Sequence, residues 1–307
     1  MTLYNHVQQL IGDTPLVEIT HFELPQGVQL FAKLEFMNPG GSVKDRLGMQ
    51  LIESAFNSGQ LQAGGTIIEP TAGNTGIGLA IAAISRGVSI ICVVPEKFST
   101  EKQQLMRALG ATVINTPNAQ GMTGAIHKAE ELVREIPGAF SPGQFSNPAN
   151  PLTYYKTLGP EIWRDLNGKV DIFVAGAGSG GTFMGTSRYL KEQNPEVRTV
   201  IVEPEGSIIA GGEPGSHKTE GIGVEFLAPF MDTSYFDQIH TIHDEDAFNR
   251  VKELTLREGL LVGSSSGAAF HAALIEAQTA SPGSRIVTIF PDSSERYLSK
   301  QIYEGGI

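Results

Sequence analysis

The 307-residue chain contains a single cysteine, Cys92, and this scarcity excludes several classes of protein. One cysteine cannot build a disulfide framework or a cysteine-rich metal site, so we expect no metal centre and a reducing, cytoplasmic location. Positive charge is also scarce, because 22 Lys and Arg stand against 33 Asp and Glu, for a formal net charge of -11. Nucleic acids and anionic membranes bind concentrated positive charge, so neither is expected as a partner.

Long apolar runs are missing as well. No stretch reaches the roughly 20 apolar residues that cross a bilayer, and the start, MTLYNHVQQLIGDTPL, lacks the basic-then-apolar pattern of a secretion signal. We therefore expect neither secretion nor membrane insertion. Glycine, in contrast, is abundant: 36 residues without a collagen-like period indicate many tight turns and loops whose backbone can approach a ligand.

Short β-branched runs alternate with longer amphipathic stretches along the chain. The expected strands are residues 28–36, 66–69, 88–94, 111–115, 170–175, 199–202 and 285–290. The expected helices are residues 43–57, 75–86, 100–109, 124–134, 154–165, 181–193, 246–257 and 266–277. This βαβ alternation predicts an α/β fold with open, twisted, mostly parallel sheets flanked by helices. The length indicates two domains, and the turn-rich residues 141–150 are the expected crossing between them.

Four glycine-rich loops carry the residues of chemical interest, and the first is Asn38-Pro-Gly-Gly-Ser-Val-Lys-Asp-Arg46. Its Lys44 stands at the beginning of a predicted helix. A solvated lysine in a first helical turn is the ordinary explanation. However, the helix macrodipole disfavours a cation at this end, so an amine here is more readily neutral. A neutral amine is what condensation with an aldehyde cofactor requires.

The second loop, Glu69-Pro-Thr-Ala-Gly-Asn-Thr-Gly76, ends a predicted strand and opens a helix. Free backbone N–H groups at the helix start, together with the hydroxyls of Thr71 and Thr75, suit one anion such as a substrate carboxylate. An ordinary turn capped by Asn74 or Thr75 explains the same residues without a ligand.

The third loop, Gly176-Ala-Gly-Ser-Gly-Gly-Thr182, follows an apolar strand and precedes a helix, a pattern typical of phosphate binding. It also fits a different cofactor. Gly176, Gly178 and Gly181 satisfy the dinucleotide fingerprint, and Glu203 lies 25 residues beyond Gly178, near where a ribose-binding acid belongs. This stretch alone is compatible with a nicotinamide-dependent dehydrogenase.

The fourth loop, Gly263-Ser-Ser-Ser-Gly-Ala-Ala269, again precedes an amphipathic helix. A serine N-cap with small residues for close helix packing is one explanation. In the other, a hydroxyl forms a hydrogen bond with a ring nitrogen. Four anion-competent loops and a lysine exceed what a dinucleotide site needs, and they fit a small phosphorylated aldehyde together with an amino acid.

In this order the four loops resemble those of the cysteine synthase and cystathionine β-synthase family, a branch of the fold type II, tryptophan synthase β-like pyridoxal-phosphate enzymes. The likeness covers nearly the whole chain. Its further motifs are Ile11-Gly-Asp-Thr-Pro-Leu16, Gln144-Phe-Ser-Asn-Pro-Ala-Asn150, Glu220-Gly-Ile-Gly223 and Pro291-Asp-Ser-Ser-Glu-Arg-Tyr297. The resemblance implies a large domain, residues 1–36 and 148–307, that binds the cofactor phosphate. It also implies a smaller mobile domain, residues 37–147, that carries the substrate-carboxylate loop and closes on the substrate, which would expel water.

The resemblance also implies roles for individual residues. Lys44 binds pyridoxal 5′-phosphate covalently and later removes the Cα proton of the substrate, Asn74 hydrogen-bonds the ring hydroxyl, and Ser265 faces the pyridine nitrogen. The phosphate loop comprises Gly178, Ser179, Gly180, Gly181 and Thr182. The substrate-binding residues are Thr71, Ala72, Gly73, Thr75, Gln144 and Gly221.

The implied reaction replaces the β-substituent of O-acetylserine or serine with a sulfur nucleophile, in cysteine or transsulfuration metabolism. Sulfide would give cysteine, and homocysteine would give cystathionine. A neutral serine opposite the ring nitrogen makes a weaker electron sink than a carboxylate would. We therefore expect the leaving group to depart from Cβ as the proton leaves Cα, with ping-pong kinetics.

Some positions depart from the common family pattern. Ala72 stands where many relatives carry serine. The sequence of the loop before Lys44, and the presence of Glu220, are more similar to cystathionine β-synthases than to cysteine synthases. The identity of the sulfur acceptor therefore stays open. The family implies a homodimer. We expect no haem, because Cys92 lies in a strand, and no allosteric nucleoside module. The tail Tyr303-Glu-Gly-Gly-Ile307 is similar to the tails by which serine acetyltransferases bind cysteine synthases, although a frayed terminus is the simpler explanation.

Three alternatives compete with this interpretation. A serine or threonine deaminase uses a similar fold, but its relatives differ in the lysine and asparagine loops. A nicotinamide-dependent dehydrogenase built on Gly176–Gly181 and Glu203 leaves Lys44, Asn74 and Ser265 without roles. A non-catalytic family member would be expected to lose the lysine, which this chain retains.

Overall fold

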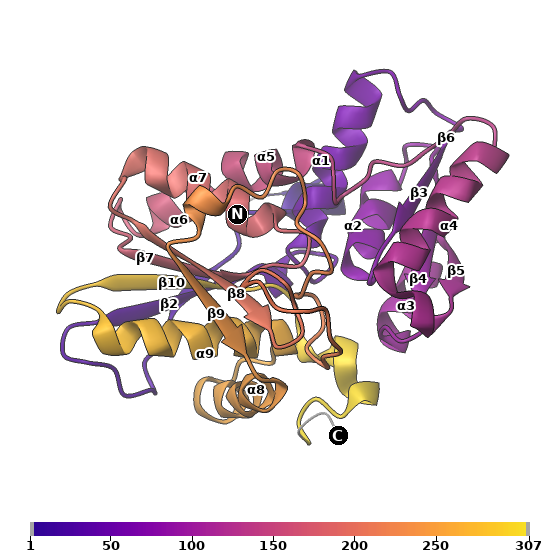
Figure 1. Ribbon diagram of the computed structural model, residues 1–307. Coiled ribbons are helices and arrows are strands. Elements are labelled where there is room, and N and C mark those ends of the chain that lie inside the picture. The colour runs from indigo at the N-terminus through magenta and orange to yellow at the C-terminus, as the bar shows by residue number, and fades with distance from the viewer. Residues whose placement is uncertain (1–2, 305–307) are drawn as a thin grey trace. The chain divides into compact units, whose positions relative to one another are not determined.

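The computed structural model describes residues 3–304 (Figure 1). The strands are β1 (Leu16–Glu18), β2 (Gln29–Leu34), β3 (Thr66–Pro70), β4 (Ser89–Pro95), β5 (Thr112–Thr116), β6 (Ala139–Phe140), β7 (Ile172–Gly176), β8 (Arg198–Pro204), β9 (Gln238–Ile242) and β10 (Arg285–Phe290). The α-helices are α1 (Lys44–Asn57), α2 (Asn74–Ala83), α3 (Thr100–Ala108), α4 (Gly121–Glu135), α5 (Ala149–Lys156), α6 (Leu158–Asp165), α7 (Gly181–Gln193), α8 (Asp244–Glu258) and α9 (Ser264–Thr279). Within residues 3–304, no helix combines the length and apolar character needed to cross a bilayer.

The observed elements confirm the predicted α/β alternation, although strands β1, β6 and β9 were not predicted and one predicted helix is divided. Residues 154–165, predicted as a single helix, belong to two helices, because α5 and α6 are separated at Thr157, where φ is -122° and ψ is -70°. The Thr157 hydroxyl donates a 2.8 Å hydrogen bond to the carbonyl of Thr153. The Thr157 N–H keeps its helical bond to the same carbonyl at 3.1 Å. Pro160, in contrast, has no N–H to donate to the Lys156 carbonyl, and its ring crowds that carbonyl, which accounts for the break.

Residue contacts divide the chain into two units. The first comprises the segment up to Ile11 together with Asn38–Asn150, and the second comprises Gly12–Met37 and the chain from Pro151 onward. The family resemblance predicts that residues 1–36 group with residues 148–307. The segment up to Ile11 falls instead with α2, where the Gln8 side chain donates to the Ile81 carbonyl at 3.1 Å.

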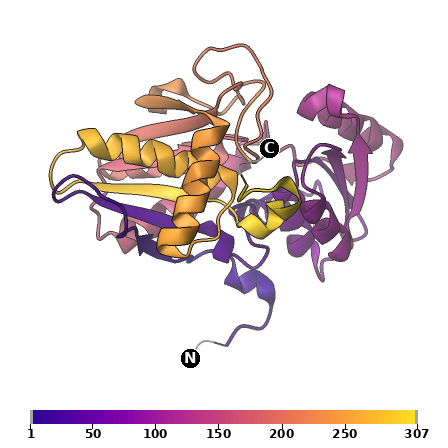
Figure 2. The same cartoon turned by 90° about the horizontal axis from the view of Figure 1, so that it is seen from below.

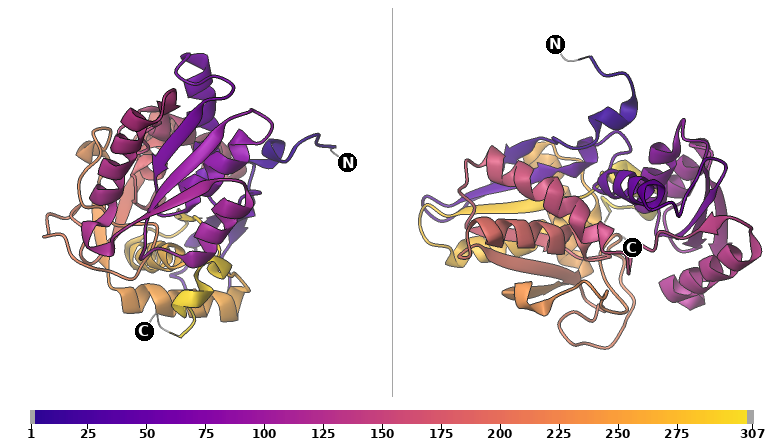
Figure 3. Two further views of the ribbon diagram at one scale, coloured as in Figure 1. Left: turned by 90° about the vertical axis from the view of Figure 1, so that its right-hand side faces the viewer. Right: turned by 90° about the horizontal axis from the view of Figure 1, so that it is seen from above.

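The second unit is built around a six-stranded sheet of order β1-β2-β10-β7-β8-β9. Its pairings are parallel except that of β1 with β2. Helices α8 and α9 cover one face, as Figure 2 shows in orange and gold, and α6 and α7 cover the other, as the right-hand view of Figure 3 shows. The carboxyl ends of parallel strands share one edge of a sheet, so the loop after β7 emerges where ligands bind in such folds.

The first unit has a parallel four-stranded sheet of order β5-β4-β3-β6. Helix α4 packs on one face through a buried cluster of Ile68, Val93, Ala125 and Ala129. Because side chains alternate along a strand, Cys92 points to the opposite face, where α2 lies (Figure 3, left). Cys92 is fully buried in β4, as its apolar surroundings in the sequence indicated.

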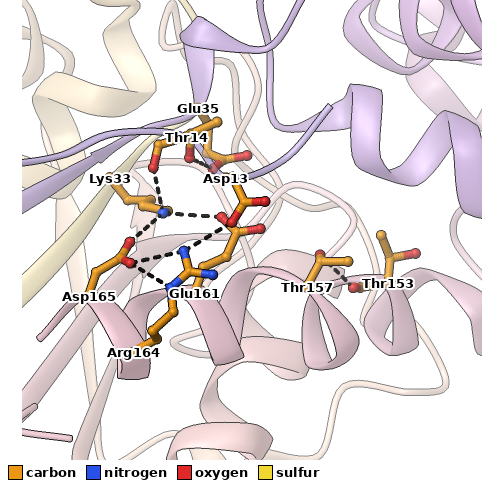
Figure 4. Close-up of polar contacts among 9 residues, drawn as sticks. All are labelled: Asp13, Thr14, Lys33, Glu35, Thr153, Thr157, Glu161, Arg164 and Asp165. Carbon is orange, nitrogen blue, oxygen red and sulfur yellow. Dashed lines mark hydrogen bonds and ion pairs between the residues drawn. The ribbon is translucent and has the colours of Figure 1, made fainter. Parts of the chain in front are cut away.

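A completely buried lysine ties three segments of the second unit together. The ammonium of Lys33, on β2, lies 3.1 Å from Glu161 and 3.0 Å from Asp165, both on α6. It also donates to the Thr14 carbonyl at 2.6 Å (Figure 4). The Lys33 side chain has no exposed surface, whereas Glu161 and Asp165 retain 9% and 23% of theirs. The charge is therefore removed from water and compensated by close partners.

Replacing Lys33 with methionine should remove the cation that Glu161 and Asp165 share, while Asp165 keeps its ion pair with Arg164 at 3.0 Å. Breaking a buried ion pair by removing one partner costs about 3–5 kcal/mol, so we expect the free energy of unfolding to fall by about that amount. Chemical denaturation of both variants measures the effect. Lys128→Met is the control, because that lysine pairs with Glu131 on an exposed helix surface. Equal midpoints for the two variants would contradict the account.

Candidate active site

Lys44 begins α1, as predicted, and α1 crosses α2 at glycines. A Cβ atom on Gly48 would lie 2.3 Å from the backbone of Gly78, and one on Gly78 would lie 2.4 Å from the Lys44 carbonyl oxygen. Only glycine permits this approach, since real Cβ atoms do not come so close to backbone atoms. The crossing places the first turn of α1, with Lys44, against the first turns of α2, which begins at Asn74.

The loop before Lys44 is held from within. The Asp45 carboxylate accepts a hydrogen bond from the Gly40 N–H at 2.5 Å, and the Lys44 N–H donates to the Ser42 hydroxyl at 3.2 Å. Asp45 and Ser42 are fully buried, while Lys44 is half-buried. The backbone that carries the amine is therefore fixed, while the side chain keeps access to its surroundings.

Hydrogen bonds at the loop after β3 involve four of the predicted carboxylate-binding residues. The Thr75 hydroxyl donates to the Gln144 Oε1 at 2.8 Å, and the Gln144 Nε2 donates to the Pro70 carbonyl at 2.8 Å. Thr71 accepts from the Gly73 N–H at 2.9 Å. Gly73 is the residue before α2, with φ of +128°, and no side chain caps the helix there. The capping role considered for Asn74 or Thr75 is thus not what the structure shows.

Glu69 lies on β3, directly before this loop, and the sequence alone does not predict a role for it. Its two carboxylate oxygens accept the backbone N–H groups of Gly143 and Gln144, each at 3.1 Å. The side chain is fully buried, and this burial raises the pKa of Glu69 to about 7. A charged residue in the otherwise uncharged strand Thr66–Pro70 was the signal that could have revealed it.

The raised pKa of Glu69 has a defined sign for folding. The folded chain binds this proton more tightly than the unfolded chain, so the group favours folding at acidic pH. That contribution is lost as the pH rises through about 7. Cys92 is paired in register with Glu69, and burial, followed by the Glu69 charge, raises the pKa of its thiol to about 12. The thiol is therefore protonated at neutral pH and unsuited to act as a nucleophile.

In the second unit, three loops converge. The phosphate loop joins β7 to α7, which begins at Gly181, with Gly180 in the left-handed region at φ of +84°. A Cβ on Gly178 would lie 2.4 Å from the Gly221 carbonyl oxygen, and one on Gly221 would lie 3.6 Å from the Ser265 Oγ. The structure thus brings the phosphate loop, Gly221 and Ser265 together.

The donors of these loops fit a phosphorylated ring cofactor. Ser179 and Thr182 flank the start of α7, where free backbone N–H groups and the helix dipole favour a dianion. Ser265 lies in the first turn of α9 and is 2% exposed, and its hydroxyl makes no hydrogen bond within residues 3–304. The neighbouring Ser264 accepts the Glu220 N–H at 3.1 Å. The alternative of close helix packing also holds here, because a Cβ on Gly267 would lie 2.0 Å from the Ala247 carbonyl oxygen of α8.

Glu203, the acid that suggested a dinucleotide, is occupied by the protein itself. It is buried on β8 and accepts the N–H groups of Ile209 at 2.8 Å and Ala210 at 3.0 Å. It also accepts the Thr241 hydroxyl at 3.0 Å. A carboxylate so engaged is a structural anchor for residues 205–210 and is not available to a ribose. No group of three or more potential metal ligands occurs in the described part of the chain.

The parallel sheets, the glycine loops and the helix-start lysine define an α/β enzyme with a phosphorylated cofactor. A family model described as "Pyridoxal-phosphate dependent enzyme" matches residues 7–292, and the chain belongs to this family. It is 61% identical to the O-acetylserine dependent cystathionine beta-synthase of Bacillus subtilis (strain 168), over all of both chains. It is 56% identical to a cysteine synthase of Helicobacter pylori (strain ATCC 700392 / 26695), over 99% of this chain and 100% of the relative.

The solved structures agree with the sequence relatives. The crystal structure of an O-acetylserine dependent cystathionine beta-synthase from Helicobacter pylori superposes with a TM-score of 0.97 at 56% identity, covering 99% of this chain and 100% of that one. The resemblance inferred from the loops is confirmed, as are the fold class and the cofactor, pyridoxal phosphate. The dehydrogenase alternative is set aside by the family and by the contacts of Glu203.

Proposed function

We propose that the chain replaces the acetate of O-acetylserine with a sulfur nucleophile, forming cystathionine from homocysteine, cysteine from sulfide, or both. The observation that carries this proposal is the 61% identity, over all of both chains, to an O-acetylserine dependent cystathionine beta-synthase. The match to a cysteine synthase at 56% identity supports the same β-replacement with a different acceptor. A deaminase is disfavoured, because both relatives are named for sulfur chemistry.

In this proposal Lys44 binds the cofactor aldehyde through its amine and, once released, takes the Cα proton of the substrate. When bound, pyridoxal phosphate withdraws electrons from the Cα–H bond and so acidifies it. The Asn74 amide orients the ring through its hydroxyl. Ser265 offers the pyridine nitrogen an uncharged partner, which does not hold it protonated as a carboxylate would. Acetate therefore leaves Cβ as Lys44 takes the proton, which favours β-replacement over chemistry that needs a long-lived carbanion.

Two sets of residues hold the ends of the reactants. The cofactor phosphate binds Gly178, Ser179, Gly180, Gly181 and Thr182. The amino acid's carboxylate binds the loop of Thr71, Ala72, Gly73 and Thr75 together with Gln144, and Gly221 contributes to substrate binding. The domain of residues 37–147 moves on substrate binding and excludes water from the reaction, which strengthens the electrostatic interactions of the site.

Absorbance spectroscopy tests the proposal. The visible band of the purified protein loaded with pyridoxal phosphate should shift on addition of O-acetylserine. Sulfide and homocysteine are then added separately. The acceptor is the compound that restores the starting spectrum, and the product formed, cysteine or cystathionine, identifies the reaction. Release of pyruvate without any sulfur compound would indicate a deaminase, and an unchanged spectrum with O-acetylserine would overturn the proposal.

We also propose a cytoplasmic homodimer. The segment before Ile11 exposes Leu3, Tyr4, Val7 and Leu10, by 89%, 49%, 41% and 45% of their surfaces, and a second copy of the chain would cover them. Sedimentation at several protein concentrations measures the assembly. Serine acetyltransferase is a further proposed partner. The tail that suggested it, Tyr303 to Ile307, lies partly outside the described residues, which end at residue 304.

A further inference from the structure

We infer that Glu69 is a positioning residue for the substrate's carboxylate, acting through the loop that carries Gln144. The inference rests on the proposed function and adds to it a residue that does not itself touch the substrate. It is carried by a connected set of hydrogen bonds within the first unit, which runs from Glu69 through Gln144 to Thr75.

The first link is a pair of hydrogen bonds from the backbone to Glu69, called the Glu69 grip below. The Glu69 Oε2 accepts the Gly143 N–H and its Oε1 accepts the Gln144 N–H, both at 3.1 Å. Two successive N–H groups matched by the two oxygens of one carboxyl group fix orientation as well as position, and the bonds are charge-assisted above the pKa of about 7, where Glu69 is ionised. From the other side, the Asn150 side chain donates to the Gln144 carbonyl at 2.7 Å. The backbone of residue 144 is therefore held at both its N–H and its carbonyl.

The second link is the orientation of the Gln144 amide. Its Nε2 donates to the Pro70 carbonyl, which can only accept, so the nitrogen must face Pro70. Its Oε1 accepts the Thr75 hydroxyl at 2.8 Å. A side-chain amide has two N–H groups, and one is used by Pro70. The second N–H is the donor that the proposed function assigns to the substrate's carboxylate.

Burial shows that this grip is not incidental. Glu69 is fully buried and Gln144 is 4% exposed. The titratable group facing Glu69 from β4 is the Cys92 thiol, and residues 143 and 144 offer it N–H groups. Burial opposes ionisation of Glu69, as its raised pKa indicates. The two backbone hydrogen bonds from Gly143 and Gln144 offset part of the cost of burying Glu69, and they account for an acidic side chain at this position.

The test is Glu69→Gln, which keeps the shape but turns one of the two acceptors into an NH₂ group. One N–H of the grip then loses its partner. Loss of a hydrogen bond to a charged group corresponds to about a tenfold change in affinity or more. We expect the KM for O-acetylserine to rise about tenfold, with kcat and the KM for sulfide little changed. A general loss of structure would not single out the KM of the substrate that carries a carboxylate.

A second experiment measures the two backbone hydrogen bonds of the Glu69 grip directly and does not depend on enzyme activity. Hydrogen exchange in peptides covering residues 141–148 should be slow in the wild-type protein, and faster in Glu69→Gln. Glu131→Gln is the matched control, since Glu131 lies exposed on α4 of the same unit and pairs with Lys128. This control should change neither the KM nor the exchange.

The outcomes separate the inference from the proposed function. Wild-type protein that does not turn over O-acetylserine contradicts the proposed function, while the exchange experiment still reports on the grip. Active wild-type protein with an unchanged KM in Glu69→Gln overturns the inference. If Glu69→Gln does not fold, hydrogen exchange in the wild-type protein tests the inference instead. Exchange of the Gly143 and Gln144 N–H groups at the rate of exposed amides would also overturn the inference.

Discussion

Replacing Lys44 with alanine should lower kcat/KM for O-acetylserine by at least about 1,000-fold, because the change removes both the covalent attachment of the cofactor and the base that takes the Cα proton. The phosphate loop is untouched, so the variant should still bind pyridoxal phosphate noncovalently. Steady-state rates and the absorbance spectrum measure the two effects together. The visible band of the loaded wild-type protein should be missing from the spectrum of Lys44→Ala.

The control for this change is Lys128→Ala, which removes an exposed lysine of α4 in the same unit. It should retain the rate and the spectrum of the wild type. The account would be contradicted if Lys44→Ala stayed within about tenfold of the wild-type rate, since general acid–base catalysis alone contributes more than that.

Replacing Gly178 with alanine should weaken the binding of pyridoxal phosphate by about tenfold to 100-fold. The new Cβ would lie 2.4 Å from the Gly221 carbonyl oxygen, so the phosphate loop or the Gly221 loop must shift. Forcing extra atoms into a packed site costs about 1–3 kcal/mol. A titration of cofactor-free protein with pyridoxal phosphate, followed by absorbance, gives the dissociation constant.

Gly212→Ala is the matched control in the same unit, because a Cβ there meets the Ser207 carbonyl oxygen at 3.5 Å, an ordinary contact. Its dissociation constant should match that of the wild type. An unchanged constant in Gly178→Ala would show that the close contact between the two loops is not required for the cofactor.

The core of the fold was predictable because strands buried in parallel sheets have sequences that are nearly continuous apolar runs. The strands β7 and β10, IFVAG and RIVTIF, are of this kind. The strands that the sequence did not predict are β1, β6 and β9, and each lies at the edge of its sheet. An edge strand is short or partly polar, as QIHTI of β9 is, and its stability comes from pairing that no local pattern reveals.

The candidate active site likewise contains features that the sequence predicts and features that it does not. Glycine loops at strand ends and the helix-start lysine are local signals, and the structure places Lys44 and Gly181 in first helical turns as predicted. Ser265, predicted in the loop just before a helix, lies in the first turn of α9. Contacts between distant segments were not predictable. Glu69 meets residues 143 and 144 across more than 70 positions, and Gly178 meets Gly221 across 43 positions. Only the folded backbone shows which partner each of these residues has.

The most direct measurement for the account as a whole is chemical trapping of the cofactor. Borohydride reduction of the protein saturated with pyridoxal phosphate, followed by proteolysis and mass spectrometry, locates any pyridoxyl group on the chain. The account predicts a single modified lysine, Lys44. A pyridoxyl group on another lysine, or none at all in protein shown to be saturated, would contradict it.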